Sequence, residues 1–237
     1  MTASGGVISR IKRSFHASAG EVVFGMEDGT VSIFGLVFGV AATTDQNSVV
    51  LIAGVTGAIA AAVSMMAGSY LDIESQRDQV KVQTEAVAES VRTDADAAAQ
   101  RVKDRLVASG MDAVSVDKVL AAIRNQPAAL TGMATALTVA GENDEEQGPF
   151  SHSIWMFVAD LFASLVPVIP FVFLPMGTAR IVSVVVTALM MAILGVGRAR
   201  LGHRPTLRTV LETVAIAAAA GVAGVLAGQA IDRWFEA

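Results

Sequence analysis

The chain is dominated by long apolar runs, separated by short polar breaks and by one long polar stretch. A lipid hydrocarbon core of about 30 Å requires roughly 20 apolar residues per helix, so each run near that length is a candidate membrane span. Five such runs cover residues 22–42, 49–70, 154–174, 179–196 and 210–231. The pattern predicts an all-α membrane protein with five transmembrane helices. Pro167 and Pro170 are expected to kink the third span and to free backbone carbonyls near its outer end.

One polar stretch, residues 72–150, interrupts this pattern between the second and third spans. It holds 14 acidic and eight basic residues, so it cannot lie in lipid. Its periodicity predicts three helices, with a break at Ser109-Gly110 and a polar linker back to the membrane. The predicted helices cover residues 72–109, 116–125 and 127–140. The chain is therefore expected to comprise an N-terminal segment, a first pair of spans, a helical insert and three final spans, at residues 1–20, 21–71, 72–150 and 151–237.

The distribution of basic residues sets the expected orientation in the membrane. Cytoplasmic loops retain Lys and Arg, and three, eight and four of the 17 basic residues fall within residues 1–20, 72–150 and 198–208. Only Arg180 and Arg233 lie on the other side. The N-terminus and the insert are therefore predicted to be cytoplasmic and the C-terminus to be outside. The high alanine content and the short loops suit a prokaryotic plasma membrane.

Composition narrows the functions that the chain can carry. Only 16% of its residues are charged, whereas soluble domains carry roughly 25%. The absence of cysteine excludes disulfides and thiolate metal sites, and the three histidines are scattered along the sequence. The sequence shows no recognisable arrangement of nucleophile, base and oxyanion donors, so an enzyme is not expected. The insert has a net charge of −6, from eight basic against 14 acidic residues, which argues against nucleic-acid binding.

Acidic residues inside the predicted spans carry the clearest chemical signal, because a carboxylate in a membrane helix costs about 3 kcal/mol on insertion scales. Glu27 and Asp28 lie in the first span and Asp160 lies in the third. Glu21 and Asp28 are seven residues apart and share one helix face, as a column of oxygen ligands for a hard cation would. The alternative is that Glu21 lies at the headgroups and that Asp28 bonds to a neighbouring helix. For Asp160 three roles remain open: lining a pathway, pairing with another helix, or taking up a proton.

Glycines and methionines mark two further features of the spans. Glycines four residues apart let helix backbones approach closely, and they occur at Gly25-xxx-Gly29, Gly35-xxx-Gly39 and Gly224-xxx-Gly228. In the first span they would also leave room for an ion beside Asp28. Ser64-Met65-Met66 offers thioether sulfur, which favours a transition metal over magnesium or calcium. Methionine in an apolar helix nevertheless serves packing in most cases.

An acidic stripe runs along the first predicted helix of the insert. At about 100° per residue, five carboxylates fall within one sector of that helix: Glu74, Asp78, Glu85, Glu89 and Asp96. Such a stripe is able to collect cations. Lys81 and Arg92 lie in the same sector, at spacings that suit ion pairs with the neighbouring glutamates, which favours a solvated, salt-bridged face.

Several short motifs, taken in order, give the chain a family resemblance. They are Gly20-Glu21-Val22-Val23, Asp28-Gly29, Ser64-Met65, Gly68-Ser69-Tyr70-Leu71, Ser75-Gln76-Arg77-Asp78, Phe162-Ala163-Ser164 and Val166-Pro167-Val168-Ile169-Pro170-Phe171. Over roughly residues 20–233 the chain resembles the vacuolar iron transporter family, which includes the yeast vacuolar iron importer and plant nodulin-like relatives. The order of the motifs and the position of the insert carry the resemblance more than any single motif does.

The resemblance implies a homodimer of five-helix protomers that moves Fe²⁺ or Mn²⁺ out of the cytosol in exchange for protons. The ion pathway would lie at the subunit interface and be lined largely by the first span. Glu21 and Asp28 match acidic positions on that pathway, and Met65 matches its methionine ligand. We therefore predict an intramembrane site at Asp28 and Met65, with Glu27 beside it and Glu21 on the approach to it. Asp160 is the candidate proton relay, the metal ions are cargo, and no cofactor is expected.

The chain departs from the family pattern at two places. A second-span glutamate would fall near Gly57, where this chain offers no side chain. The family's cytoplasmic metal-binding glutamates match poorly, since the nearest positions are Val87, Ser90, Ala98 and Leu137. Met133 does match a methionine of that region, and Glu85 and Glu89 are candidate substitutes in a shifted register. These gaps motivate a rival hypothesis, a transport-inactive dimeric membrane protein of the same fold that uses its insert for interaction.

Overall fold

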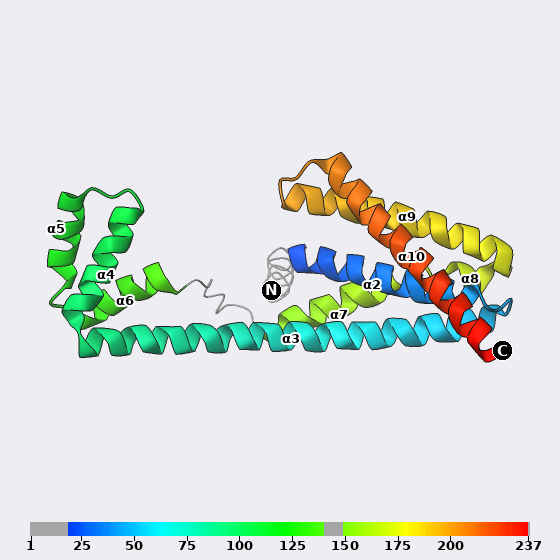
Figure 1. Cartoon of the computed structure of the whole chain (residues 1–237), viewed down its shortest axis with the longest axis horizontal. Coiled ribbons are helices and arrows are strands. Elements are labelled where there is room, and N and C mark those ends of the chain that lie inside the picture. The colour runs from blue at the N-terminus through cyan, green and yellow to red at the C-terminus, as the bar shows by residue number, and fades with distance from the viewer. Residues whose placement is uncertain (1–18, 140–148, 237) are drawn as a thin grey trace, which may run out of the picture. The chain divides into compact units, whose positions relative to one another are not determined.

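The computed structural model describes residues 19–139 and 149–236, and the regular elements in these ranges are helices (Figure 1). The chain divides into two compact units, Met1–Tyr70 together with Gln147–Ala237, and Leu71–Glu146. The first unit contains α2 (Ala19–Ala41), the beginning of α3 (Asn47–Thr93), α7 (Pro149–Leu165), α8 (Pro170–Phe173), α9 (Met176–Leu201) and α10 (Thr206–Glu236). The second unit contains the end of α3, α4 (Ala95–Ala108), α5 (Ala113–Ile123) and α6 (Pro127–Thr138). This arrangement agrees with the predicted all-α class.

Four helices of the described chain are long and apolar enough to cross a membrane. They are α2 over Val22–Ala41, α3, α9, and α10 over Thr206–Phe235. They coincide with four of the five predicted spans. The apolar part of α7, His152–Leu165, is shorter, so α7 alone does not reach the length of the predicted third span.

The third predicted span is broken at its prolines, as expected from the sequence. α7 ends and α8 begins across a turn at residues 166–169, because Pro167 cannot donate a helical hydrogen bond and disfavours helix in the residue before it. Other helices satisfy the freed carbonyls. Ser183 Oγ donates to the carbonyl of Pro167 at 2.7 Å, and Asn47 Nδ2 donates to the carbonyl of Leu174 at 2.7 Å.

Helix α2 packs so closely against α10 that their backbones are in contact, which confirms a packing role for two of the predicted glycine pairs. A Cβ atom built at Gly224 would collide with the carbonyl oxygen of Gly35, and one at Gly228 would collide with that of Gly39. A Cβ at Gly39 would in turn lie 2.8 Å from the carbonyl oxygen of Gly224. The contacts follow the same order along both helices, so α2 and α10 run parallel. In Figure 1, α2 lies among α7, α9 and α10 and contacts each of them.

Apolar clusters fill the interior of the first unit. One joins α2, α3 and α8, where Val37 and Phe171 are almost fully buried. Another joins α9 and α10 around Met191. The outer faces of the long helices also remain apolar: Ile52 and Ile193 are 66% and 68% exposed. Apolar side chains on both the inside and the outside are what helices in lipid require.

The insert has an apolar core of its own. Val91, Val102, Val116 and Leu130 come from its four helical pieces in turn, and all four are almost fully buried. This core requires the helical pieces to fold back on one another. The sequence periodicity predicted the helices of the insert but not how they pack.

The single helix predicted over residues 72–109 is wrong, because two helices occupy that range. α3 continues from the second span to Thr93, and α4 begins at Ala95. Asp94 breaks the run, since its backbone leaves helical geometry and its side chain accepts a hydrogen bond from Ala97 N at 2.8 Å. A side-chain acceptor at this position satisfies a free N–H group of the first turn, so Asp94 starts a new helix.

The predicted break at Ser109-Gly110 is confirmed. Gly110 has a φ of 97°, and its N–H and that of Met111 bond to carbonyls in the last turn of α4 at 2.9 and 3.2 Å, which is the Schellman arrangement. α5 then begins at Asp112, whose carboxylate accepts a hydrogen bond from Ser115 N at 3.0 Å. Hydrogen bonds from the Ser115 hydroxyl, and then from its backbone N–H, hold the pKa of Asp112 below its usual range.

Candidate functional site

Asp28 lies on an exposed stripe of α2, which α3 touches at its far end, Leu36. Phe24, Asp28, Ser32 and Leu36 follow one another at four-residue intervals, and all four are exposed. This spacing keeps them on one helix face. A carboxylate that faces lipid carries an energetic cost, so this face requires a polar partner, an ion or a second protein surface.

Met65 of α3 lies at about the same level of the bundle as Asp28. The antiparallel helices α2 and α3 touch where a Cβ built at Gly57 would lie 2.5 Å from Leu36 Cδ2. Asp28 lies eight residues before Leu36, and Met65 lies eight residues after Gly57. At a rise of about 1.5 Å per residue, each lies about 12 Å from that contact in the same direction. This register puts a thioether and a carboxylate at about the same level. The side chain of Met65 is half-buried.

The contact at Gly57 also explains the absence of a side chain there. The tip of Leu36 fills the space that a second-span glutamate would enter, and Ile33 Cδ1 lies 3.2 Å from the same Cβ position. An acidic side chain at residue 57 would therefore displace an apolar contact between α2 and α3.

Glu27 is adjacent to Asp28 in sequence but has different surroundings. Its side chain is only 11% exposed, and its Oε2 accepts a hydrogen bond from Arg198 Nη1 of α9 at 3.1 Å. Within the described residues, Glu27 Oε1 has no hydrogen-bond partner. The ion pair joins α2 to the end of α9, and it fixes which face of α2 turns inward at this level.

Asp160 of α7 is fully buried against α2. A Cβ built at Gly29 would collide with Asp160 Oδ1 and would lie 2.5 Å from Ser164 Oγ. Among the described residues, neither carboxylate oxygen of Asp160 nor the hydroxyl of Ser164 has a hydrogen-bond partner. Burying an unpaired carboxylate is costly, so this position suits a proton or a cation. Gly29 directly follows Asp28, so Asp160 of α7 lies against the same turn of α2 that carries Asp28.

Sequence reasoning missed Ser164 and Arg198. Ser164 follows Asp160 by four residues and so shares its helix face. This spacing alone would have indicated Ser164 as a polar neighbour of Asp160. Arg198 enters the sequence argument only as a marker of orientation. It is separated from Glu27 by 171 positions, so no local pattern predicts their pairing.

Glu21 belongs to the first turn of α2. Its side chain lies outside the described ones, and its role on the approach to the site stays a prediction.

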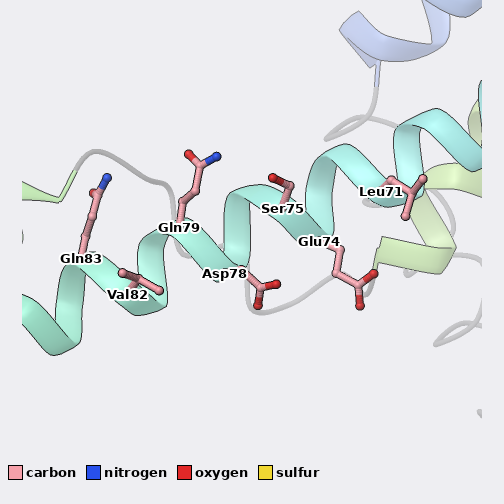
Figure 2. Close-up of a pocket in the computed structure, with 7 residues that line it drawn as sticks. All are labelled: Leu71, Glu74, Ser75, Asp78, Gln79, Val82 and Gln83. Atoms are coloured by element: carbon pink, nitrogen blue, oxygen red, sulfur yellow. The ribbon is translucent and has the colours of Figure 1, made fainter.

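The predicted acidic stripe of the insert is shorter in the structure. Figure 2 shows Glu74 and Asp78 pointing to the same side of α3, beside a hollow whose wall also includes Leu71 and Val82. All of these side chains are exposed. Asp96 does not continue the stripe, since the helix breaks at Asp94 and its carboxylate bonds instead to Arg124 at 2.7 Å.

The other acids predicted for a cytoplasmic metal site are also exposed. Glu89 pairs with Arg92 at 3.2 Å, as its spacing predicts, and Glu85 lies on the surface of α3. Met133 is half-buried and packs against the core of the insert. In the part of the chain that the structure describes, no three His, Asp or Glu side chains form a group that could hold a metal. A site at Glu85, Glu89 and Met133 therefore stays a prediction.

A bundle of apolar helices with carboxylates on and against its central helix defines a polytopic α-helical membrane protein. The chain belongs to the VIT family, whose model matches residues 19–229. This confirms the family resemblance found in the sequence motifs.

Individual relatives match over nearly the whole chain. Vacuolar iron transporter 1 of Eucalyptus grandis is 26% identical over 222 residues, which cover 92% of this chain and 89% of the relative. Vacuolar iron transporter 2 of Oryza sativa subsp. japonica is 28% identical over 223 residues, which cover 92% of this chain and 90% of the relative. Vacuolar iron transporter 1 of Arabidopsis thaliana is 25% identical, with 92% and 89% coverage.

Proposed function

We propose that this protein carries Fe²⁺, with Mn²⁺ as the near alternative, out of the cytosol in exchange for protons. Membership of the VIT family supports transport rather than catalysis, and the names of the relatives support iron as the cargo. The observation that carries the proposal is the exposed carboxylate of Asp28 on α2. The antiparallel register of α2 and α3 at Gly57 supports a position for the Met65 thioether at a similar level of the bundle.

Asp28 and Met65 together favour a transition metal. Carboxylate oxygen binds hard and borderline cations alike, whereas thioether sulfur adds affinity for the softer ones. Magnesium and calcium gain little from such a sulfur ligand. Glu21, two turns before Asp28 on the same helix, would attract the cation toward the site.

A homodimer would complete this site. The exposed stripe of α2 carries Asp28 between Phe24 and Ser32, and its exposure to lipid would be unfavourable. If a second copy covers the stripe, the two Asp28 carboxylates face each other across a two-fold axis, because a C2 interface uses the same patch twice. The ion pathway would then run between the two copies of α2.

Asp160 is proposed as the proton relay. A proton on its carboxyl group would remove the cost of a buried charge in the absence of metal. A cation arriving near Asp28 would favour release of that proton, since a nearby positive charge stabilises the carboxylate form. Ser164 Oγ, on the same side of α7, would provide a hydrogen-bonding partner for either form.

Five crossings and a cytoplasmic insert remain part of the proposal. The third crossing would combine α7, the turn and α8. α7 runs parallel to α2, because Gly25 lies against Met156 and Gly29 against Asp160, so both helices would cross in the same direction. The basic residues support a cytoplasmic N-terminus and insert and an outer C-terminus. The short loops and the alanine content support a prokaryotic plasma membrane as the location.

The alternative is a transport-inactive dimer of the same fold that uses its insert for interaction. The apolar filling of the Gly57 position by Leu36 favours it. The lack of a three-acid group among the described residues of the insert favours it as well.

Uptake of Fe²⁺ and Mn²⁺ into proteoliposomes with an imposed pH gradient tests the proposal. Asp28→Asn keeps the side-chain volume but removes the charge, so uptake should fall by about tenfold or more. Asp45→Asn is the matched control, because the Asp45 side chain is 94% exposed in the loop after α2 and an amide oxygen there can still accept the hydrogen bond from Arg180. Wild-type activity in Asp28→Asn would contradict the site, and a folded dimer without any uptake would favour the alternative.

The same assay tests the proton relay separately. Asp160→Asn should abolish the dependence of uptake on the pH gradient while it preserves downhill movement of the metal. Unchanged coupling in Asp160→Asn would exclude Asp160 as the relay and would leave the metal site at Asp28 unaffected.

A further inference from the structure

The insert contains a cavity that the proposed transport role does not use. It has a volume of about 430 Å³ and lies between the end of α3, α4 and α6. Val87, Ala98 and Leu137 form an apolar part of its wall, and Arg101 and Arg105 line it as well.

This cavity lies where the metal-binding glutamates of the family would fall. The four nearest positions, Val87, Ser90, Ala98 and Leu137, all line it, and none of them is charged. Asp104 is the acidic residue of the lining, and its Oδ1 accepts a hydrogen bond from Gln100 Nε2 at 2.9 Å. A divalent cation requires several oxygen ligands, carboxylates prominent among them. The residues present therefore do not fit a metal ion.

Hydrogen bonds hold the two guanidinium groups at the cavity. Arg101 Nη2 donates to Ser90 Oγ, and Arg105 Nη1 donates to the carbonyl of Leu137 at 2.6 Å. Each guanidinium has five N–H donors, so one bond fixes its direction and leaves other donors for a ligand. Planar, anchored guanidinium groups match the oxygens of a phosphate group, to which they can donate in pairs.

We propose that this cavity binds a phosphate monoester. The phosphate group would accept hydrogen bonds from Arg101 and Arg105, and the organic part would lie against Val87 and Leu137. Two positive charges against one carboxylate favour an oxyanion over a cation, and the volume leaves room for more than the phosphate group. This inference does not depend on transport, because binding in the insert and uptake across the membrane are measured separately.

Calorimetric titration of the full-length protein in detergent with phenyl phosphate and inorganic phosphate tests the inference. Phenyl phosphate should bind saturably, and Arg101→Gln and Arg105→Gln should each weaken it by about tenfold. Arg124→Gln should leave the affinity unchanged, since Arg124 pairs with Asp96 and does not line the cavity. Hydrogen exchange should slow on binding in residues 86–91, 98–105 and 134–138.

A second variant tests the cavity without removing either arginine, in case the arginine variants fail to fold. Ser90→Glu would place a carboxylate beside Arg101, keep the arginine paired and remove phosphate binding. Equal affinity for inorganic and phenyl phosphate would assign free phosphate as the ligand, whereas tighter binding of phenyl phosphate would assign the ester. Absence of saturable phosphate binding, or full binding in the Arg101→Gln/Arg105→Gln double variant, would overturn the inference.

Discussion

The two units of this protein treat charged residues in opposite ways. In the first unit, Asp160 is fully buried and has no hydrogen-bond partner among the described residues, and Glu27 is buried beside Arg198. In the insert, the side chains of Arg92 and Glu89 remain 73% and 67% exposed although they are paired. Water stabilises exposed charges whether or not they pair, and lipid does not. A buried charge in the first unit therefore points to function or to a fixed partner, whereas an exposed, paired charge of the insert such as Glu89 keeps its surface soluble.

Glycine also serves different purposes in the two units. Gly224 and Gly228 have helical neighbours so close that a Cβ atom would collide with the backbone of α2. Gly110 of the insert has open space around it but a positive φ of 97°. The first unit thus needs glycine for its size, and the insert needs it for its backbone freedom.

The largest expected effect comes from adding a methyl group between α2 and α10. Gly224→Ala would force the helices apart and should lower the stability of the detergent-solubilised protein by about 3 kcal/mol. Gly177→Ala is the control in the same unit, because a Cβ at Gly177 meets nothing within 4 Å. Unfolding curves measured side by side would refute the contact if the two variants were equally stable.

A smaller effect is expected at the ion pair between α2 and α9. Glu27→Gln should cost about 2 kcal/mol, less than a fully buried pair, because the side chain of Arg198 is 45% exposed. The reversal Glu27→Arg with Arg198→Glu should recover part of that loss, which a double-mutant cycle on thermal unfolding would quantify. If Glu27 were instead a ligand on the ion pathway, the reversal would restore stability and leave metal uptake abolished.

The smallest effect is expected at the turn between α4 and α5. Gly110→Ala should destabilise the insert by about 1 kcal/mol, since a side chain is unfavourable at positive φ. Gly132→Ala in α6 also faces open space but lies in a helix, so it should be neutral or slightly stabilising. Faster hydrogen exchange in α4 and α5 of the full-length Gly110→Ala protein, and not of Gly132→Ala, is the result that supports this distinction.

Most of the fold follows from features that are local in sequence. Apolar runs predict α2, α9, α10 and the first part of α3, and Pro167 predicts the break after α7. The error at residues 72–109 has a local cause as well. Asp94 is one more charged residue in a long polar stretch, and its backbone geometry shows that it caps a new helix.

The site was predictable only in part, because its partners are remote in sequence. The cost of burying charge singles out Glu27, Asp28 and Asp160 from the sequence alone. It does not separate them: Asp28 is exposed, Glu27 is paired with Arg198, and Asp160 is buried without a partner among the described residues. Those differences depend on which helices surround α2, and hydrophobic periodicity does not specify neighbours.

The backbone contact between α2 and α10 has a mechanical consequence. With carbonyl groups of α2 seated directly against Gly224 and Gly228, neither helix can turn about its own axis or slide along the other without a steric clash. The two helices must therefore move together as one rigid body. Any motion of α2 that displaces Asp28 would carry α10 with it, so a spectroscopic label on α10 would report such a motion without touching the ion site.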